Sequence, residues 1–380
     1  MRRALILLAL GGLLGGAFAF GFALSGREQA AAPRTESVVD AVRAELAARY
    51  YRPIPSRVLR LEDVRSMIAA LGDPYTEYLN DAAYRLLQRE IAGSYTGIGI
   101  TLLPAPAGLL VIATQAGPGR NAGIRVGDTI TRVGGTPAAQ LGLAGALARI
   151  TGPIGSRVNL RIERAGAAIT RSIRREEVQD PAVVTRLVTV AGRTYGYIRI
   201  TVFRRGVAAD VAAALRRVRQ TVVDGVVLDL RENPGGLFDE ALNVSSLFLS
   251  RGVVVSLQGA HQPREVYRAS GHPVLPRLPL AVLVNGYTAS SAEIVAAALH
   301  EDRRATLVGE HTFGKAVVQS IDPLQDGGAL ALTTGRYFTP TGADISRKGL
   351  RPDVRAVDDP RTPTDDVLTA ALSSLAAAQS

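Results

Sequence analysis

Short apolar runs alternate with longer segments of helical spacing through the second half of the chain, and this alternation constrains the fold more than any other feature. Unbroken runs of valine, leucine and isoleucine are typical of strands buried on both faces, and helices between them are typical of layered α/β proteins. The predicted strands are residues 195–200, 226–230, 253–257 and 280–284. The predicted helices are residues 207–219, 238–249, 289–300 and 365–378. The sequence therefore predicts a layered α/β core.

A different pattern occupies residues 93–176, where short strands are separated by glycines and Gly134-Gly135 indicates a hairpin turn. Helical spacing precedes this stretch at residues 37–49, 61–71 and 82–91. We therefore divide the chain into successive parts. They are a membrane anchor or signal segment (1–26), a linker (27–36), an N-terminal helical region (37–92), an inserted domain (93–176), the core (177–357) and a C-terminal helix (358–380).

The chain begins with Met1-Arg2-Arg3, and an uncharged apolar stretch then runs from Ala4 to Leu24. Its length matches the ~20 residues that a helix needs to cross a bilayer and exceeds the apolar part of most cleaved signals. Ala17-Phe18-Ala19 has the small residues of a signal-cleavage site, so an anchor and a cleaved signal both stay open, and we favour the anchor. Either alternative exports the rest of the chain and predicts an extracytoplasmic location.

Composition argues against several classes of function. The chain has no cysteine, and its four histidines show no ligand spacing, so we expect no metal site and no cofactor. The net charge of +10 comes from arginines scattered through every predicted element, and aromatic residues amount to only 5%. A nucleic-acid site would gather basic and aromatic side chains together, so we expect no nucleic-acid partner.

Lysine is scarce: of 44 basic residues, only Lys315 and Lys348 are lysines. A buried lysine can lose its proton and act as a base, whereas arginine stays protonated at any working pH. Lys315 begins a predicted strand, residues 315–319, and side chains at positions i and i+4 of a strand share a face. This spacing predicts that Gln319 orients the lysine amine.

Ser290 lies at the start of the predicted helix 289–300, after a buried strand and a turn. Unpaired N–H groups and the dipole at a helix N-terminus favour developing negative charge. Ser290 is therefore a candidate nucleophile, and the N–H of Ser291 is a candidate oxyanion donor. The glycine turn Asn233-Pro234-Gly235-Gly236 follows another buried strand and can present a second N–H.

The residues alone leave alternatives open for this dyad of serine and lysine. A serine at a helix start is most often only a cap, and a lone lysine is usually a solvated surface charge. A pair of Ser290 with His311 or His300 is a competing assignment, although no third residue at a supporting spacing favours it.

Several pieces of the sequence occur together in one family. They are Asp73-Pro74-Tyr75 with Tyr78-Leu79, Asp229-Leu230-Arg231-Glu232-Asn233-Pro234-Gly235-Gly236, the helix with Ala289-Ser290, Gly309-Glu310 with Thr312-Phe313-Gly314-Lys315, and Arg336-Tyr337-Phe338-Thr339-Pro340. By their order and spacing, residues 37–357 resemble the C-terminal processing peptidases (tail-specific proteases), serine proteases with an inserted PDZ domain. The resemblance implies an α/β protease core of the ClpP and crotonase type.

The resemblance also implies roles for single residues. Ser290 would be the nucleophile, Lys315 the general base and Gln319 the residue that orients the lysine, with N–H groups of Gly236 and Ser291 as the oxyanion hole. One departure is Ser291, because the family usually has alanine directly after its nucleophile. Glu301 stands where some members have an acidic residue near the site.

Residues 93–176 resemble a PDZ domain, and Gly97-Ile98-Gly99-Ile100 is the candidate peptide-binding loop. Such a loop offers backbone N–H groups to a terminal carboxylate while the peptide adds as a β-strand. We therefore expect protein or peptide substrates with apolar C-termini.

The expected function is that of a serine endopeptidase with a Ser-Lys dyad that cleaves exported proteins. The alternative is a non-catalytic PDZ scaffold that binds protein tails, although intact Ser290, Lys315 and Gln319 argue against it. An acyl-transfer enzyme of the crotonase type fits poorly with export and with the insert. The physiological substrate, a homo-oligomer and a regulatory partner all stay open.

Overall fold

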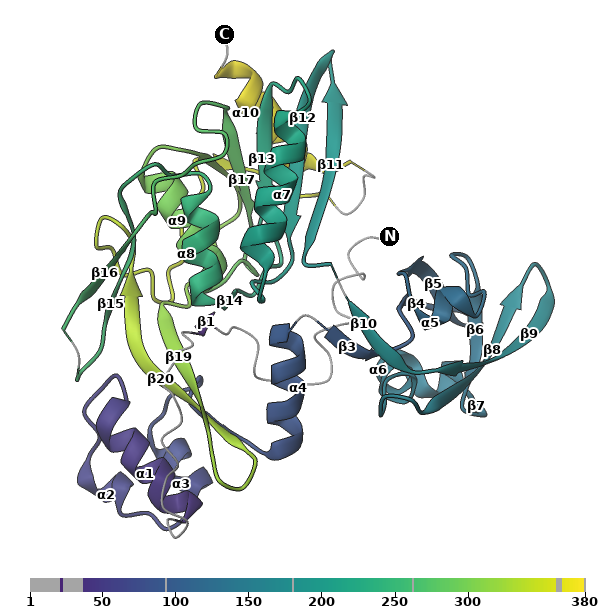
Figure 1. The fold of residues 1–380 in the computed structure, drawn as a ribbon, viewed down its shortest axis with the longest axis horizontal. Helices are drawn as coiled ribbons and strands as arrows, with labels where there is room; N and C mark the ends of the chain where they lie inside the picture. Colours follow the sequence, from purple (N-terminus) through teal and green to yellow (C-terminus); the bar gives the residue numbers. More distant parts are fainter. Residues whose placement is uncertain are drawn as a thin grey trace. The chain divides into compact units, whose positions relative to one another are not determined.

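The computed structural model describes residues 21–22, 37–92, 94–179, 181–261, 263–359 and 364–378. Contacts within the chain separate two compact units (Figure 1). Among the described residues, the smaller unit runs from Ala92 to Pro181, and the larger unit combines those up to Ile91 with those from Ala182 onward.

A central sheet forms the core of the larger unit. Its strands lie in the order β11 (Val183–Val190), β12 (Arg193–Ile200), β13 (Gly225–Asp229), β17 (Leu280–Val284), β18 (Thr306–Gly309) and β21 (Val354–Arg355). Only the hairpin of β11 and β12 is antiparallel, and every other neighbouring pair is parallel. Because β13 and β17 pair in register, the turns that leave their carboxyl ends lie side by side.

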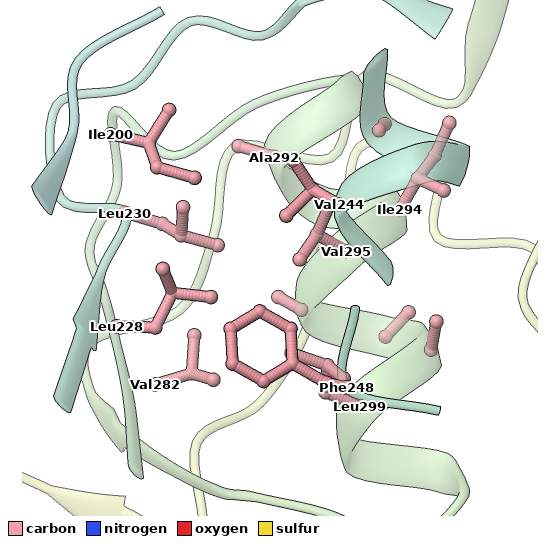
Figure 2. Packing of buried hydrophobic residues seen from close by; sticks show 14 of the residues in the cluster. Ile200, Leu228, Leu230, Val244, Phe248, Val282, Ala292, Ile294, Val295 and Leu299 are labelled. Carbon is pink, nitrogen blue, oxygen red and sulfur yellow. The ribbon is translucent and has the colours of Figure 1, made fainter. Parts of the chain in front are cut away.

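Helices cover both faces of this sheet. On one face pack α7 (Val207–Arg219), α8 (Phe238–Ser246) and α9 (Ser291–Glu301), and on the other packs α10 (Asp366–Ala377). Side chains alternate along each strand, so Leu228 and Leu230 face the helix layer while Val227 faces α10. Figure 2 shows Leu228 and Val282 of the sheet opposite Val295 of α9.

A second sheet completes the larger unit. It contains, in order, β14 (Gly236–Leu237), β1 (Gly21–Phe22), β19 (Val317–Pro323), β20 (Ala329–Phe338), β15 (Val253–Gln258) and β16 (Glu265–Arg268), and β2 (Glu77–Leu79) pairs with β20. The N-terminal helices are α1 (Val38–Arg49), α2 (Ser56–Leu59), α3 (Val64–Ala70) and α4 (Asp81–Ala92). Side chains of α1 and α3 pack against Leu330 and Leu332 of β20.

The smaller unit has a core of its own. Its sheet contains β4 (Ile100–Ala105), β5 (Gly108–Thr114), β6 (Thr129–Val133), β8 (Arg157–Arg164) and β9 (Ala167–Arg174), with β7 (Thr136–Pro137) beside β6. Its helices are α5 (Pro118–Asn121) and α6 (Ala138–Ile150). A separate pair of strands, β3 (Ser94–Gly97) and β10 (Glu176–Gln179), lies at its two chain ends, so residue 176 falls inside a strand.

The layered α/β core predicted from the apolar runs is confirmed, and its predicted strands and helices lie within a few residues of the observed ones. The prediction missed β11 because this edge strand exposes most of its side chains and lacks a clear alternation. The apolar stretch Ala4–Leu24 lies outside the described residues except for β1. Among the helices that the structure describes, none has the length and apolar character to span a bilayer.

Candidate active site

Ser290 caps the N-terminus of α9, where the chain leaves β17 through the turn Asn285–Thr288. Its φ of 56° and ψ of −120° belong to a turn conformation that glycine normally occupies, so the backbone at this serine is strained. The side chain is fully buried, and its hydroxyl has no hydrogen-bond partner among the described residues. A buried hydroxyl held in a strained turn without a partner is available for chemistry.

Ser291, the next residue, is also buried, but its hydroxyl donates a hydrogen bond of 2.9 Å to the carbonyl of Gly236. This bond joins the first turn of α9 to the glycine turn beside it. The two adjacent serines therefore differ in state, because only the hydroxyl of Ser290 is unoccupied.

Lys315 is the buried lysine of the larger unit, with 1% of its side chain exposed. Its Nζ donates to Oε1 of Gln319 at 2.8 Å, and Nε2 of Gln319 donates to the carbonyl of Tyr75 at 2.6 Å. Burial lowers the pKa of the Lys315 amine to about 7, against the pull of nearby carboxylates. A substantial fraction of this amine is therefore neutral near pH 7.

The predicted contact between Lys315 and Gln319 is present, but the predicted strand starts too early. β19 begins at Val317, and its register with β20 shifts between Val318 and Gln319. The chain turns at Gly314, whose φ is 82° and where a Cβ would lie 2.7 Å from the N of Gly349. The amine and the amide meet through this turn and the bulge, not through a regular i, i+4 spacing.

Glu293 is a buried carboxylate that the sequence interpretation missed. Its two oxygens accept bonds from the N–H of Ser290 (2.9 Å), the hydroxyl of Thr312 (2.5 Å), and the N–H groups of Gly314 (2.7 Å) and Lys315 (3.0 Å). Burial raises the pKa of Glu293, while these donors act to lower it. The residue fastens the backbone of Ser290 to the backbone of Lys315. Its spacing three residues after a helix-start serine is the signal that could have revealed it.

The turn after β13 lies directly against the turn that carries Ser290. Asn233 is buried, and its side chain donates to the carbonyl of Ile200 and accepts from the N–H of Gly235, while its carbonyl accepts from Ala289. A Cβ on Gly235 would lie 2.8 Å from Cβ of Ser290, so only glycine permits this approach. Gly236 follows within the same turn, so its backbone stands beside the start of α9.

Arg231 in this turn joins the site to the C-terminal helix. Its guanidinium pairs with Asp229 at the end of β13, and with Asp358 and Asp365 before α10. Asp365 also caps α10 by accepting from the N–H of Leu368. The sequence did not reveal this network, which holds the turn in place through ion pairs to β13 and to the segment before α10.

Two of the other candidates lie away from Ser290. His300 and Glu301 lie in the last turn of α9, at the opposite end of the helix, where His300 pairs with Asp353 at 2.9 Å and Glu301 accepts from Thr341. His311 is exposed.

The candidate peptide-binding loop lies in the smaller unit. Gly97 ends β3 and Ile100 begins β4, and Ile98 between them is buried in the core of this unit. Gly99 has a φ of 73°. The carbonyls of Ile98 and Gly99 accept bonds from the N–H groups of Gly119 and Gln115.

Known proteins resemble this chain along most of its length. The model of peptidase family S41 matches residues 194–356. The chain is 36% identical to carboxyl-terminal-processing peptidase 2, chloroplastic, of Arabidopsis thaliana, over 79% of this chain and 61% of that protein. It is 36% identical to the carboxyl-terminal-processing protease of Synechocystis sp., over 80% of this chain and 72% of that protein. For the carboxy-terminal processing protease of Bacillus subtilis the identity is 33%, over 82% and 67%.

A solved structure, that of the photosystem II D1 C-terminal processing protease, is similar with a TM-score of 0.57 at 29% identity. The similarity covers 88% of this chain and 96% of that one. The mixed α/β fold described above is therefore similar to that of a protease.

Proposed function

The chain belongs to the carboxyl-terminal-processing peptidases, the serine-type peptidases of family S41, and on this premise we propose that Ser290 and Lys315 form its catalytic dyad. Lys315 is the observation that carries the proposal, because its buried amine has a pKa of about 7 and is held by Gln319. Such an amine is partly deprotonated at neutral pH, as a general base must be. The buried, unpartnered hydroxyl of Ser290 supports its role as the nucleophile.

In the first step, Nζ of neutral Lys315 takes the hydroxyl proton of Ser290 while Oγ bonds to the carbonyl carbon of a substrate peptide. The N–H groups of Gly236 and Ser291 stabilise the oxyanion that forms. Lys315 then gives the proton to the leaving amine, the C–N bond breaks and the acyl-enzyme remains. Water, deprotonated by Lys315, hydrolyses this ester and restores the hydroxyl of Ser290.

The substrate, on this proposal, crosses the active site in an extended conformation between β14 and β19. Support comes from β1, whose Gly21 and Phe22 pair in parallel with Gly236 and Leu237 while Phe22 stands opposite Gln319. Backbone pairing of this kind tolerates many side chains, so selection must come from elsewhere.

The smaller unit, on the same proposal, supplies that selection as an inserted PDZ domain. Its loop Gly97–Ile100 would take the carboxylate of a substrate with an apolar C-terminus, and the names of the relatives, which process carboxyl termini, support this. The layered core supports a relation to the ClpP and crotonase type. The apolar N-terminal stretch supports an extracytoplasmic location.

A peptidase assay of the wild type, Ser290→Ala, Ser291→Ala and Lys315→Arg tests the dyad. We expect Ser290→Ala and Lys315→Arg to lose about a thousandfold or more in kcat, because one lacks the nucleophile and the other keeps a charge that cannot act as a base. Ser291→Ala should keep kcat within about tenfold while its Tm falls, because it loses only the bond to Gly236. Cleavage by Ser290→Ala but not by Ser291→Ala would transfer the nucleophile role, and failure of the wild type to cleave casein would favour a non-catalytic scaffold.

A further inference from the structure

Tyr75 reaches Lys315 from the N-terminal region, far away in the sequence. Its carbonyl accepts the bond from Nε2 of Gln319 at 2.6 Å, and the centre of its ring lies 4.9 Å from Nζ of Lys315. One residue therefore contacts both the base and the amide that holds the base.

The turn that carries Tyr75 is fixed on both sides. Asp73 accepts bonds from the N–H of Tyr75 (3.0 Å) and the hydroxyl of Thr76 (2.7 Å), and it is 8% exposed. Thr76 in turn bonds to the hydroxyl and the N–H of Thr333 in β20, at 3.1 Å each. Because β20 is the neighbour of β19, which carries Gln319, the turn and the amide are held by one sheet.

The carbonyl of Tyr75 decides which end of the Gln319 amide faces the lysine. An amide has one acceptor and one donor end, and a carbonyl can receive only from the donor end. With Nε2 committed to Tyr75, Oε1 points to Nζ of Lys315. In a flipped amide, Oε1 of Gln319 would face the carbonyl oxygen of Tyr75, and Nε2 would face the N–H donors of Lys315. Neither contact is a hydrogen bond, so the orientation is fixed.

The ring of Tyr75 acts on the other state of the base. Once Lys315 has taken the serine proton, its ammonium lies over the face of an aromatic ring, which attracts a desolvated cation. Burial raises the pKa of the Tyr75 phenol, so the ring stays neutral. The other ionisable groups that act on the amine are Asp73, Glu77 and Glu293, and the hydroxyl of Tyr337 contacts Glu293 in turn.

We propose that Tyr75 is a positioning residue for the general base: its carbonyl sets the Gln319 amide, and its ring supports the protonated Lys315 during turnover. The proposal rests on the proposed dyad of Ser290 and Lys315. It gives the turn around Tyr75 a role in catalysis, beyond the support that the rest of the N-terminal region gives to β20.

The test compares kcat and KM between pH 5.5 and 9.5 for the wild type, Tyr75→Phe, Tyr75→Leu and Tyr78→Leu. Tyr75→Leu keeps an apolar cover over the amine but lacks the ring face, so the ammonium is less stable. We expect the acidic limb of kcat/KM to move down by about half a pH unit or more and the plateau kcat to fall about tenfold, with KM within about threefold. Tyr75→Phe, which keeps the aromatic ring, should show the wild-type pH profile.

Tyr78→Leu is the matched control, because Tyr78 lies in the same segment and its hydroxyl bonds to Asp326 instead. It should keep the wild-type pH profile even where Tm falls. An unchanged acidic limb in Tyr75→Leu, or the same change in Tyr78→Leu, would overturn the role of the ring. Full activity in Lys315→Arg would rule out the dyad itself. If Lys315→Arg lost activity while Tyr75→Leu kept the wild-type profile, the dyad would stand and only the role of Tyr75 would fail.

Discussion

At the scale of single residues, the buried amine of Lys315 lowers the stability of the folded protein. The gap between the ordinary lysine pKa of 10.5 and the value of about 7 corresponds to about 5 kcal/mol. Because the folded-state pKa is the lower one, the unfolded chain binds more protons between these two values, and stability rises with pH across that range. The penalty is fully present below pH 7 and absent above about pH 10.5. The protein thus gives up stability at neutral pH to keep a partly neutral amine buried beside Gln319.

Replacing Lys315 with methionine should therefore stabilise the protein while abolishing its activity. In urea unfolding at pH 6, we expect Lys315→Met to exceed the wild type by roughly 1–4 kcal/mol, less than the full penalty because the bond to Gln319 is lost. The advantage should shrink as the pH rises from 7 to 10. Lys348→Met is the control, since Lys348 is exposed. Its free energy of unfolding should stay within about 0.5 kcal/mol of the wild type at pH 6 and at pH 10. A pH-independent difference for Lys315→Met would contradict the lowered pKa.

The sequence pointed to Ser290, Lys315 and Gln319 as candidates because rare residue types and helix-start patterns are visible locally. It gave no role to Glu293 or to Tyr75, for different reasons. Glu293 has a local signal in its capping spacing, but its partners Thr312 and Gly314 come from a distant loop. Tyr75 contacts Gln319 through its carbonyl, and no side-chain pattern reports where a carbonyl points.

At the scale of elements, the start of α9 depends on the loop before β19. Every partner of the Glu293 carboxylate is a donor, and three of them are backbone N–H groups. The buried strands β13 and β17 were predictable from continuous apolar runs, since both faces of each strand are covered. β10 was not predicted, because its partner β3 lies at the other end of the insert, where Gly97 pairs with Glu176.

Glu293→Gln tests whether the Glu293 carboxylate holds the start of α9 to the loop before β19. A glutamine presents an NH₂ group to donors that need an acceptor, so at least one buried N–H loses its partner. We expect a loss of roughly 2–4 kcal/mol in thermal or urea unfolding and at least a hundredfold loss in kcat. Glu301→Gln, at the other end of the same helix, should change both by little, because its amide oxygen can still accept from Thr341. Equal effects of the two variants would show that the position of the carboxylate is immaterial.

At the scale of the whole molecule, two units with separate cores share one chain. The insert was recognisable because its glycine-rich pattern differs from the helical region before it and the apolar runs after it. Its closing strand β10 was missed, since pairing of Glu176 with Gly97 joins the two ends of the insert. The N-terminal region groups with the core, which no pattern indicated, because β2 pairs with β20 and the helices α1 and α3 pack on Leu330 and Leu332, far along the chain.

The proposed role of the smaller unit predicts that a free carboxylate is required for tight binding. Calorimetry with full-length Ser290→Ala, which should leave peptides intact, compares one apolar-ended peptide with its C-terminal amide. We expect the amide to bind at least about tenfold more weakly, because hydrogen bonds to a charged group contribute about 1.5–3 kcal/mol. Gly99→Ala should weaken the binding of the peptide with a free carboxylate by a similar factor. The φ of 73° disfavours a side chain at this position, and the added Cβ would lie 3.3 Å from Val178, so the loop would be disturbed. Gly166→Ala, at a φ of 80° in open space between β8 and β9, carries similar backbone strain and should bind normally. Equal affinity for acid and amide would place substrate selection outside the loop Gly97–Ile100.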